Sequence, residues 1–311
     1  MEALAPARTS RRLAAVEVGE RLTLLPDKRR LFAVDTYFRE AYTDLCDDLA
    51  LLRRAALVVL KPDALVGRRI VPCLELLRGH GFRPVAARTF AYDRLLIRET
   101  WRYQFNVASD DRIDVVDLLL TASPSLMVLL WDERPREACP ASVRLGALKG
   151  PSDPQLRRPG QLRHELGVVT ALFNFVHTSD EPADVVRDLG LLLDRADRRR
   201  LLAELHAQRD GSAELRGCID ALQAAHPAHD LDCERSLDRL RHAPDAGVRR
   251  AAEAVARDRA RWRELLPLGD RIDRWDLLSI ATAAIECNVP GVEPVVASVA
   301  GEQWARRWAH D

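Results

Sequence analysis

A short apolar run followed by a polar turn occupies residues 55–64, which read AALVVLKPDA. The run has the length and the β-branched content of a buried strand. Pro62 ends that strand, because proline has no N–H with which to continue a hydrogen-bonded ladder. Lys61 therefore stands at a turn from strand to helix, where its cation can point at phosphate oxygens. A strand-end lysine that simply faces solvent is the alternative interpretation.

Strand-like and helix-like segments continue to alternate after this stretch. Apolar runs and period-two patterns predict strands at 83–90, 126–131 and 168–176. Apolar spacings of three and four predict helices at 70–77, 95–101, 113–120 and 180–193, the last with Asp180 as its cap. This alternation predicts one α/β domain, which we place at residues 55–193.

The flanking segments have a different pattern. On the N-terminal side, residues 16–25 and 30–34 predict a small hairpin around a Pro26-Asp27 turn, followed by a helix that begins near Thr36. After residue 193 the chain is rich in Leu, Ala, Arg, Asp and Glu at helical spacing, without a strand-like run. We therefore predict an N-terminal extension at 1–54 and an all-α domain of about five helices at 194–311.

Composition and charge exclude several classes of protein. The 311 residues include 47 basic and 47 acidic side chains, so the formal net charge is zero and nucleic acid is not an expected partner. The longest uncharged apolar run, at 167–176, has about half of the roughly 20 residues that a membrane-spanning helix needs. We therefore expect no association with a membrane.

The cysteines indicate the compartment. Six cysteines are scattered along the chain, and none forms a CxxC pair, so zinc-binding and thioredoxin-type sites are not expected. The N-terminal residues include arginines but lack the apolar core of a secretory signal. These features predict a protein of the reducing cytoplasm.

A second stretch with chemical potential is NFVHTSD at residues 174–180. The period of a strand places Phe175 and His177 on one face. A histidine at a strand end, just before a helix, is well placed to act as a nucleophile. Its second ring nitrogen then needs an acceptor to fix the tautomer, and Asp188 on the following helix is a candidate. A partly buried structural histidine is the alternative.

A third stretch, at residues 152–163, presents arginines on rigid turns. Arg157, Arg158 and Arg163 are interspersed with prolines and a glycine. Guanidinium groups bind phosphate in bidentate fashion. A solvated basic loop is the more common meaning of such a run.

Taken together, residues 55–193 resemble the nucleoside diphosphate kinase family. Lys61-Pro62-Asp63 is similar to its KPD motif, and Arg144 resembles the arginine ahead of its G-x-T-[DN]-P loop. The segments GPSDP at 150–154, PGQLR at 159–163 and NFVHTSD at 174–180 resemble that loop, the PGTIR segment and the N-x-[IV]-H-[GA]-S-D signature. Several segments in the right order are more specific than any one of them.

The resemblance implies an α+β fold with a ferredoxin-like antiparallel sheet covered by helices. It also implies ping-pong phosphoryl transfer, in which a histidine takes the γ-phosphate of a nucleoside triphosphate and passes it to a nucleoside diphosphate. His177 would be that nucleophile. Asp188 stands where the family has a glutamate that orients the imidazole, and Ser179 would support it. Aspartate is one methylene shorter, so we expect a longer or water-bridged contact.

The resemblance further implies ATP as the donor and Mg²⁺ that bridges the β and γ oxygens, with no metal held by protein side chains alone. It assigns Lys61, Arg144, Arg163 and Asn174 to the phosphates and the sugar. Ser152 stands in place of a phosphate-binding threonine, and Trp101 in place of a tyrosine near the transferring phosphate. Ile113 is nearest to the phenylalanine on which the family stacks the base. An aliphatic residue there loses base stacking, on the order of 1–3 kcal/mol.

Three functions stay open at this point. The first is a phosphotransferase that acts on nucleoside tri- and diphosphates. The second has the same chemistry but a non-nucleotide small molecule as acceptor, which the altered base site and the helical addition favour. The third is a catalytically dead nucleotide-binding scaffold. The protein could form a homo-oligomer, although the segments on either side of the domain could cover the faces through which the family assembles.

Overall fold

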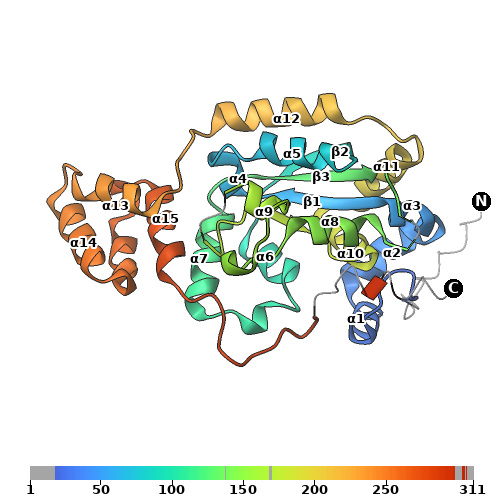
Figure 1. Ribbon diagram of the computed structural model, residues 1–311, viewed down its shortest axis with the longest axis horizontal. Helices are drawn as coiled ribbons and strands as arrows, with labels where there is room; N and C mark the ends of the chain where they lie inside the picture. The colour runs from blue at the N-terminus through green and yellow to red at the C-terminus, as the bar shows by residue number, and fades with distance from the viewer. Residues whose placement is uncertain (1–17, 137, 168–169, 298–302, 305, 307–311) are drawn as a thin grey trace, which may run out of the picture.

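A four-stranded sheet forms the centre of the computed structural model, which describes residues 18–136, 138–167, 170–297, 303, 304 and 306. The strands are β1 (Ala55–Leu60), β2 (Phe82–Phe90), β3 (Ser125–Asp132) and β4 (Val176–Thr178). Their order is β2-β3-β1-β4, and each neighbouring pair is antiparallel. The sheet is therefore ferredoxin-like, as the resemblance implied (Figure 1).

The two central strands are fully buried. β1 pairs with β3 from Ala55 opposite Trp131 to Leu60 opposite Leu126, and each residue of both strands is buried. Burial on both faces explains why these strands read as continuous apolar runs. On its other side β1 pairs with β4, with Leu60 opposite Val176. The end of β1 and the start of β4 therefore lie side by side, which brings the predicted lysine turn close to the predicted histidine.

Helices cover the sheet on both sides. α5 contacts β2, whereas α8 and α10 contact β1. In Figure 1, α5 lies above the strands, and α8 and α10 lie below them. The helices of this domain are α4 (Pro62–Val66), α5 (Ile70–Gly79), α6 (Arg94–Thr100), α7 (Asp110–Leu120), α8 (Ala141–Lys149), α9 (Leu162–Glu165) and α10 (Pro182–Leu192), with short 3-10 turns η2 (Phe105–Val107) and η3 (Pro154–Leu156).

The predicted N-terminal hairpin is wrong, because the described residues 18–34 contain no strand. Residues 26–32 form helix α1 (Pro26–Phe32), and residues 16 and 17 of the other half lie outside the described residues. Pro26 starts the helix because the first helical position needs no N–H and favours a fixed φ. The helix expected near Thr36 is confirmed as α2 (Thr36–Leu45), and η1 (Cys46–Asp48) and α3 (Leu49–Arg54) lead into β1.

α2 packs closely on α10, the helix that carries Asp188. A β-carbon on Gly190 of α10 would lie 2.2 Å from the carbonyl oxygen of Tyr37. Only glycine permits this approach of the two backbones. The N-terminal segment is therefore part of the wall behind the predicted histidine site.

The strand predicted at 168–176 is mostly wrong. Residues 168 and 169 lie outside the described residues, and 170–175 form no strand; β4 begins only at Val176. Backbone groups there close local turns, since Asn174 N–H donates to Leu172 O and Val176 N–H donates to Asn174 O. Phe175 has a φ of +62°. An apolar run alone does not show these turns.

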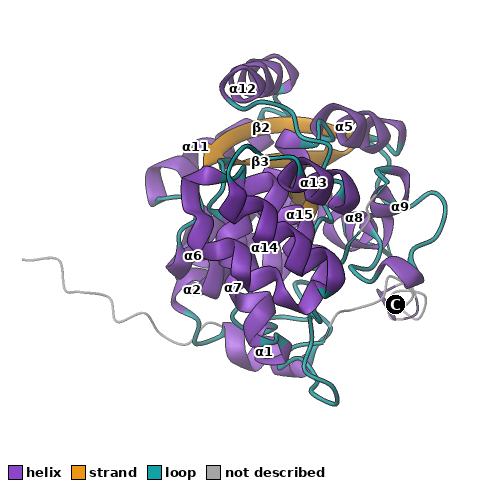
Figure 2. Cartoon of the chain, turned by 90° about the vertical axis from the view of Figure 1, so that its left-hand side faces the viewer, coloured by secondary structure: helices purple, strands orange, loops and turns teal. Residues whose placement is uncertain are grey.

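The region after α10 is helical up to Ala284, and the described residues 285–297 that follow are not helical. Its helices are α11 (Arg195–His206), α12 (Ser212–Ala225), α13 (Cys233–Arg241), α14 (Ala246–Arg257) and α15 (Arg274–Ala284), with the 3-10 segment η4 (Arg259–Arg271). α11 and α12 contact β2, whereas α13, α14, η4 and α15 pack mainly on one another, in front of the sheet in Figure 2. Division of the chain at residues 54 and 194 stays a prediction.

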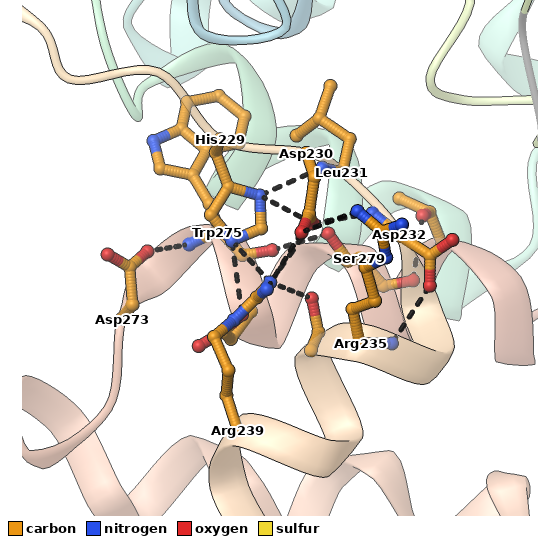
Figure 3. Close-up of polar contacts among 12 residues, drawn as sticks. His229, Asp230, Leu231, Asp232, Arg235, Arg239, Asp273, Trp275 and Ser279 are labelled. Atoms are coloured by element: carbon orange, nitrogen blue, oxygen red, sulfur yellow. Dashed lines mark hydrogen bonds and ion pairs between the residues drawn. The ribbon is translucent and has the colours of Figure 1, made fainter.

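A polar network fixes the linker between α12 and α13 (Figure 3). His229 Nε2 lies 3.1 Å from Asp276 Oδ1, and Arg239 Nε donates to the same oxygen at 2.8 Å. Arg239 also donates to Asp230 at 2.8 Å. The backbone N–H of His229 donates to the carbonyl of Val66 in α4. The network therefore joins the last helices to each other and to the domain that carries the sheet.

In the described ranges, no helix combines the length and the apolarity that crossing a membrane requires. The same ranges contain no group of three or more His, Cys, Asp or Glu side chains arranged to hold a metal ion.

Candidate active site

A cavity of about 1190 Å³ opens beside the meeting point of β1 and β4. Its lining combines residues from α6, α7, α8, α10 and the loop at 150–163. Of the residues predicted from sequence, nine line it: Lys61, Trp101, Arg144, Ser152, Arg163, Asn174, His177, Ser179 and Asp188. The chain therefore brings together segments that are up to 127 residues apart in sequence, between Lys61 and Asp188.

His177 lies at the centre of this arrangement. It is paired opposite Val59 of β1, and its side chain is 19% exposed. Its Nε2 atom lies 3.6 Å from Asp188 Oδ2, which is too long for a hydrogen bond. Ser179 Oγ donates to that carboxylate oxygen at 2.7 Å. The longer contact is the one expected of an aspartate in place of a glutamate.

The helix that carries Asp188 is anchored at its first turn. Its N-cap is Glu181 and not Asp180, which corrects the predicted cap. Asp184 accepts a hydrogen bond from the Glu181 backbone N–H at 2.9 Å. The fully buried Glu181 carboxylate accepts from Thr23 Oγ1, Lys28 Nζ and Trp304 Nε1. Side chains from both flanking segments thus fix the start of α10.

Lys61 is a buried cation at the cavity wall. Its side chain is 7% exposed, its Nζ donates to Leu172 O at 2.9 Å, and Asp63 Oδ2 lies 3.6 Å away. Burial lowers the pKa of the Lys61 ammonium to about 8, against the opposing effect of Asp63. Asp63 also accepts from the Phe175 N–H at 2.8 Å, which connects the start of α4 to the turn before β4.

Arg163 is the second buried cation. It donates to Gly150 O and Val176 O, both at 2.9 Å, and so joins the 150–163 loop to β4. Its Nε has no hydrogen-bond partner among the residues that the structure describes. Burial, reinforced by Arg157, lowers the pKa of Arg163 to about 10. Gly150 has a φ of +79°, a backbone conformation that favours glycine, so a side chain at this turn would be strained.

Residues 54–197 match the family model of nucleoside diphosphate kinase. This segment is a nucleoside diphosphate kinase-family domain. It is 25% identical over 138 residues to the nucleoside diphosphate kinase of Thermococcus kodakarensis, which covers 43% of this chain and 74% of that protein.

Solved structures similar to this kinase domain include the NDP kinase of Pyrobaculum aerophilum, with a TM-score of 0.39 and 17% identity, covering 46% of this chain and 97% of that one. A halophilic nucleoside diphosphate kinase from Halobacterium salinarum, solved with CDP, has a TM-score of 0.39 and 22% identity, covering 46% and 88%. The Borrelia burgdorferi enzyme, solved with vanadate and ADP, has a TM-score of 0.39 and 19% identity over the same shares.

Arg144 of the kinase domain lines the cavity, but its donors are engaged elsewhere. Its Nε donates to Asp132 Oδ2 at 2.9 Å, and its Nη2 donates to the other oxygen of that carboxylate. Nη1 donates to His80 O at 3.0 Å, and the guanidinium lies 4.2 Å from the centre of the Phe82 ring. All three nitrogens therefore have protein acceptors, which indicates a structural role.

Ile113 is the one predicted site residue that does not line the cavity. The face of α7 that does so carries Arg112, Val116, Leu119 and Leu120 instead. Ile113 and Arg112 are neighbours in α7, and successive side chains on a helix point about 100° apart, so only one of the two faces the cavity. Arg112 is therefore a cavity residue that the sequence analysis missed.

Phe105 and Lys149 were also missed. Phe105 stacks on Trp101 with the ring centres 5.8 Å apart, and the Trp101 ring in turn meets His177 edge-on at 5.3 Å. Lys149 lines the cavity and lies 3.2 Å from Asp180 Oδ1. Lysine is rare in this chain, with three among 47 basic residues, and Lys149 directly precedes the predicted 150–154 loop. That rarity was the available signal for Lys149.

Asn174 and Ser152 also line the cavity, and each makes a hydrogen bond within the protein, Asn174 through its side chain and Ser152 through its backbone. Asn174 Nδ2 donates to Ala171 O at 2.7 Å, and Ser152 O accepts from Arg157 Nη2. The lining also contains the cations Lys61, Arg163 and Arg112, together with further arginines, Lys149 and the carboxylates Asp180, Asp184 and Asp188. The cations of this set can stabilise an anionic ligand with several charges.

Proposed function

We propose that the kinase domain transfers the γ-phosphate of a nucleoside triphosphate to a nucleoside diphosphate through a phosphohistidine on His177. The observation that carries this proposal is the position of His177 in a cavity with two buried cations, with one ring nitrogen turned to a carboxylate. In the first half-reaction a bond forms between the ring nitrogen and the γ-phosphorus, and the bond from that phosphorus to the β,γ-bridging oxygen breaks. The second half-reaction reverses these steps with another diphosphate.

Asp188 and Ser179 would set the state of the imidazole. A carboxylate beside Nε2 favours the tautomer that carries its proton there, because that proton faces the negative charge. Nδ1 then keeps its lone pair and is the nitrogen available for attack on phosphorus. The contact to Asp188 at 3.6 Å leaves room for either a bridging water or a small movement.

The cations would hold the transferring phosphate. Phosphoryl transfer depends mainly on position and on stabilisation of charge over the phosphate oxygens. Lys61 and Arg163 are preorganised by their bonds to Leu172 O, Gly150 O and Val176 O. Arg112 would add a third cation from the α7 wall. Arg144 would act indirectly, since Asp132 engages it.

Mg²⁺ would be held at this site through the nucleotide. The two cavity carboxylates at the start of α10, Asp180 and Asp184, lie 3.2 Å from Lys149 Nζ and 2.7 Å from Lys28 Nζ respectively. A cage of protein oxygens is therefore not offered, and phosphate oxygens would supply the ligands. Bound in this way, Mg²⁺ would neutralise negative charge on the β- and γ-phosphates.

Incubation with γ-³²P-ATP and Mg²⁺, without acceptor, tests the proposal. The wild-type protein should acquire acid-labile, base-stable label, and His177→Ala should acquire none. His164→Ala is the matched control, because His164 is 44% exposed beside Glu165 and does not line the cavity. It should label normally. An unlabelled wild-type protein that binds ATP would overturn the proposal and leave the nucleotide-binding scaffold.

A second candidate keeps the same first half-reaction but has a non-nucleotide small molecule as acceptor. The cavity volume of about 1190 Å³ is above the usual range of about 300–1,000 Å³, and its lining includes Phe32 of α1, which lies in the N-terminal segment. Discharge of isolated labelled protein separates the two. ADP should discharge the label from either enzyme, because it reverses the first half-reaction. A nucleotide enzyme should also lose its label to GDP, CDP and UDP, whereas a repurposed enzyme should keep it with these three diphosphates.

A further inference from the structure

The chain after α15 returns to the kinase domain and lies along the hairpin formed by α6, η2 and α7. We name residues 286–296 the strap. In Figure 1 the strap is the red segment that passes beneath α7. It is far from this hairpin in sequence, with 177 positions between Ser109 and Glu286. The hairpin supplies Trp101, Phe105 and Arg112 to the cavity wall.

Backbone hydrogen bonds join the strap to the hairpin. Ala108 and Asn288 form an isolated antiparallel bridge. Ser109 N–H donates to Cys287 O at 3.2 Å, and Val289 N–H donates to Val107 O at 2.8 Å. The strap therefore extends the hairpin as a short strand would, with directional bonds on both sides of the bridge.

Side chains of the hairpin add to these bonds. Asn106 uses both ends of its amide, since Nδ2 donates to Glu293 O at 2.8 Å and Oδ1 accepts from Val295 N–H at 3.2 Å. Ser109 Oγ donates to Glu286 O at 2.5 Å and accepts from Arg112 N–H at 3.1 Å. Ser109 is the N-cap of α7, so the same hydroxyl starts that helix and binds the strap.

Asn288 carries the connection into the cavity. Its Oδ1 accepts from Arg112 Nη1 at 2.6 Å. The Arg112 guanidinium also lies 5.7 Å from the centre of the Phe105 ring. Within the described part of the chain, the buried Nε of Arg112 has no hydrogen-bond partner. One side of this cation is thus held by the strap, while other donors remain for a ligand in the cavity.

We propose that Asn288 is a positioning residue that orients Arg112 toward the phosphates of a bound nucleoside di- or triphosphate, and that the strap fixes the α7 wall of the cavity. This inference rests on the proposed function of the cavity. An arginine that is free in solution loses conformational entropy when it binds a ligand. A neutral amide that already holds the arginine reduces this entropy cost, and it does not neutralise the positive charge. A carboxylate at position 288 would instead compete with the phosphates.

Binding of ADP by calorimetry tests the role of Asn288. Asn288→Ala should raise the Kd for ADP about 5- to 20-fold, which is less than the loss of a direct hydrogen bond to a charged group would cause, because Asn288 acts through Arg112. It should raise KM for the triphosphate by a similar factor and leave kcat within about twofold, since the bond acts equally before and during transfer. Glu293→Ala is the matched control, because the strap uses only the backbone of this exposed residue, and its Kd should stay within about twofold.

A double-mutant cycle distinguishes positioning from a general structural effect. In an Arg112→Ala background, the further change Asn288→Ala should alter the Kd for ADP by less than about twofold. Effects that multiply in full would overturn the positioning role. So would an Asn288→Ala protein that binds ADP as the wild type does.

Hydrogen exchange tests the strap independently of nucleotide. Asn106→Ala removes two of the strap bonds and does not line the cavity. It should speed exchange of the amides at 103–112 at least fivefold in the absence of ligand. Unchanged exchange would overturn the strap. A wild-type protein that fails to bind ADP but shows the faster exchange in Asn106→Ala would instead overturn the proposed function and the role of Asn288, and would leave the strap in place.

Discussion

His177 Nε2 and Asp188 Oδ2 lie 3.6 Å apart, with Ser179 bound to that same carboxylate oxygen. The carboxylate faces the imidazole but stops short of a direct hydrogen bond. Aspartate therefore holds the histidine less tightly than a longer acid would. One additional methylene at position 188, as in glutamate, could bring the carboxylate within hydrogen-bond distance of His177.

Asp188→Glu should close this gap and raise the rate of phosphohistidine formation a few-fold. Asp188→Asn should lower it about 10- to 100-fold, because the amide no longer stabilises a proton on Nε2. Rapid-quench measurement of ³²P incorporation gives both rates. Ser179→Ala is the companion variant and should cause the smaller loss. Equal rates in Asp188→Asn and the wild type would show that Asp188 does not orient the histidine.

Affinity for ADP should fall as the pH rises above about 8. Burial lowers the pKa of Lys61 to about 8, so the free protein loses this positive charge above that pH. A bound phosphate favours the protonated amine, so binding must then take up a proton, and Kd should approach a tenfold increase per pH unit. Titrations from pH 7 to 9.5 measure this slope. Lys61→Arg should flatten it, and an unchanged slope in that variant would assign the effect to another group.

The same pKa shift predicts a change in stability with a defined sign. Lys61 binds its proton less tightly in the folded chain than in the unfolded one, where its pKa is near 10.5. The free energy of unfolding should therefore increase as the pH rises from about 8 to 10.5. Lys61→Met should remove this contribution. Urea unfolding at a series of pH values, compared between the two proteins, measures the difference.

Arg144→Ala should affect stability more than nucleotide binding. Asp132 is fully buried, and loss of Arg144 would leave its carboxylate without its charged partner. Breaking a buried pair in this way costs about 3 kcal/mol in the free energy of unfolding. Urea denaturation measures this loss, and the Kd for ADP should change by less than threefold. Intact stability together with lost ADP binding would instead place Arg144 on the phosphates.

Phe105→Leu should weaken binding of nucleotides but not of bare phosphate chains. Phe105 and Trp101 present stacked rings at the cavity, which offers an aromatic surface despite the absence of an aromatic residue at position 113. Loss of one stacking ring should raise the Kd for ADP about 5- to 50-fold. Inorganic tripolyphosphate is the control ligand and should bind with unchanged affinity. A parallel loss for both ligands would indicate collapse of the hairpin.

The sequence predicted those parts of the molecule that local patterns determine. β1 and β3 are buried on both faces, and their apolar runs match their bounds within one residue. The turn before β4 was missed because the positive φ of Phe175 depends on the distant Asp63 carboxylate, which binds its N–H. Pro26 was predicted to form a turn, but it begins α1. Proline is common both in turns and at the first position of a helix, and the local sequence does not separate the two.

The candidate site divides in the same way. His177, Lys61 and Arg163 lie within short motifs, so their positions could be predicted from the residues around them. The commitment of Arg144 to Asp132 and the support of Arg112 by Asn288 depend on pairs 12 and 176 positions apart. Such partners are set by the tertiary structure. No single stretch of sequence contains both members of the second pair.

The contacts of Glu181 bear on whether the kinase domain can fold without its flanking segments. Its buried carboxylate receives Thr23 and Lys28 from one flank and Trp304 from the other, at the start of the helix that carries Asp188. A fragment trimmed to the family boundaries at 54 and 197 would leave an acid in an apolar setting without these donors. Excision would then disturb the helix that places Asp188 beside His177. The flanking segments therefore belong to the structural unit that supports the site, and a boundary drawn at 54 or 197 cuts through that unit.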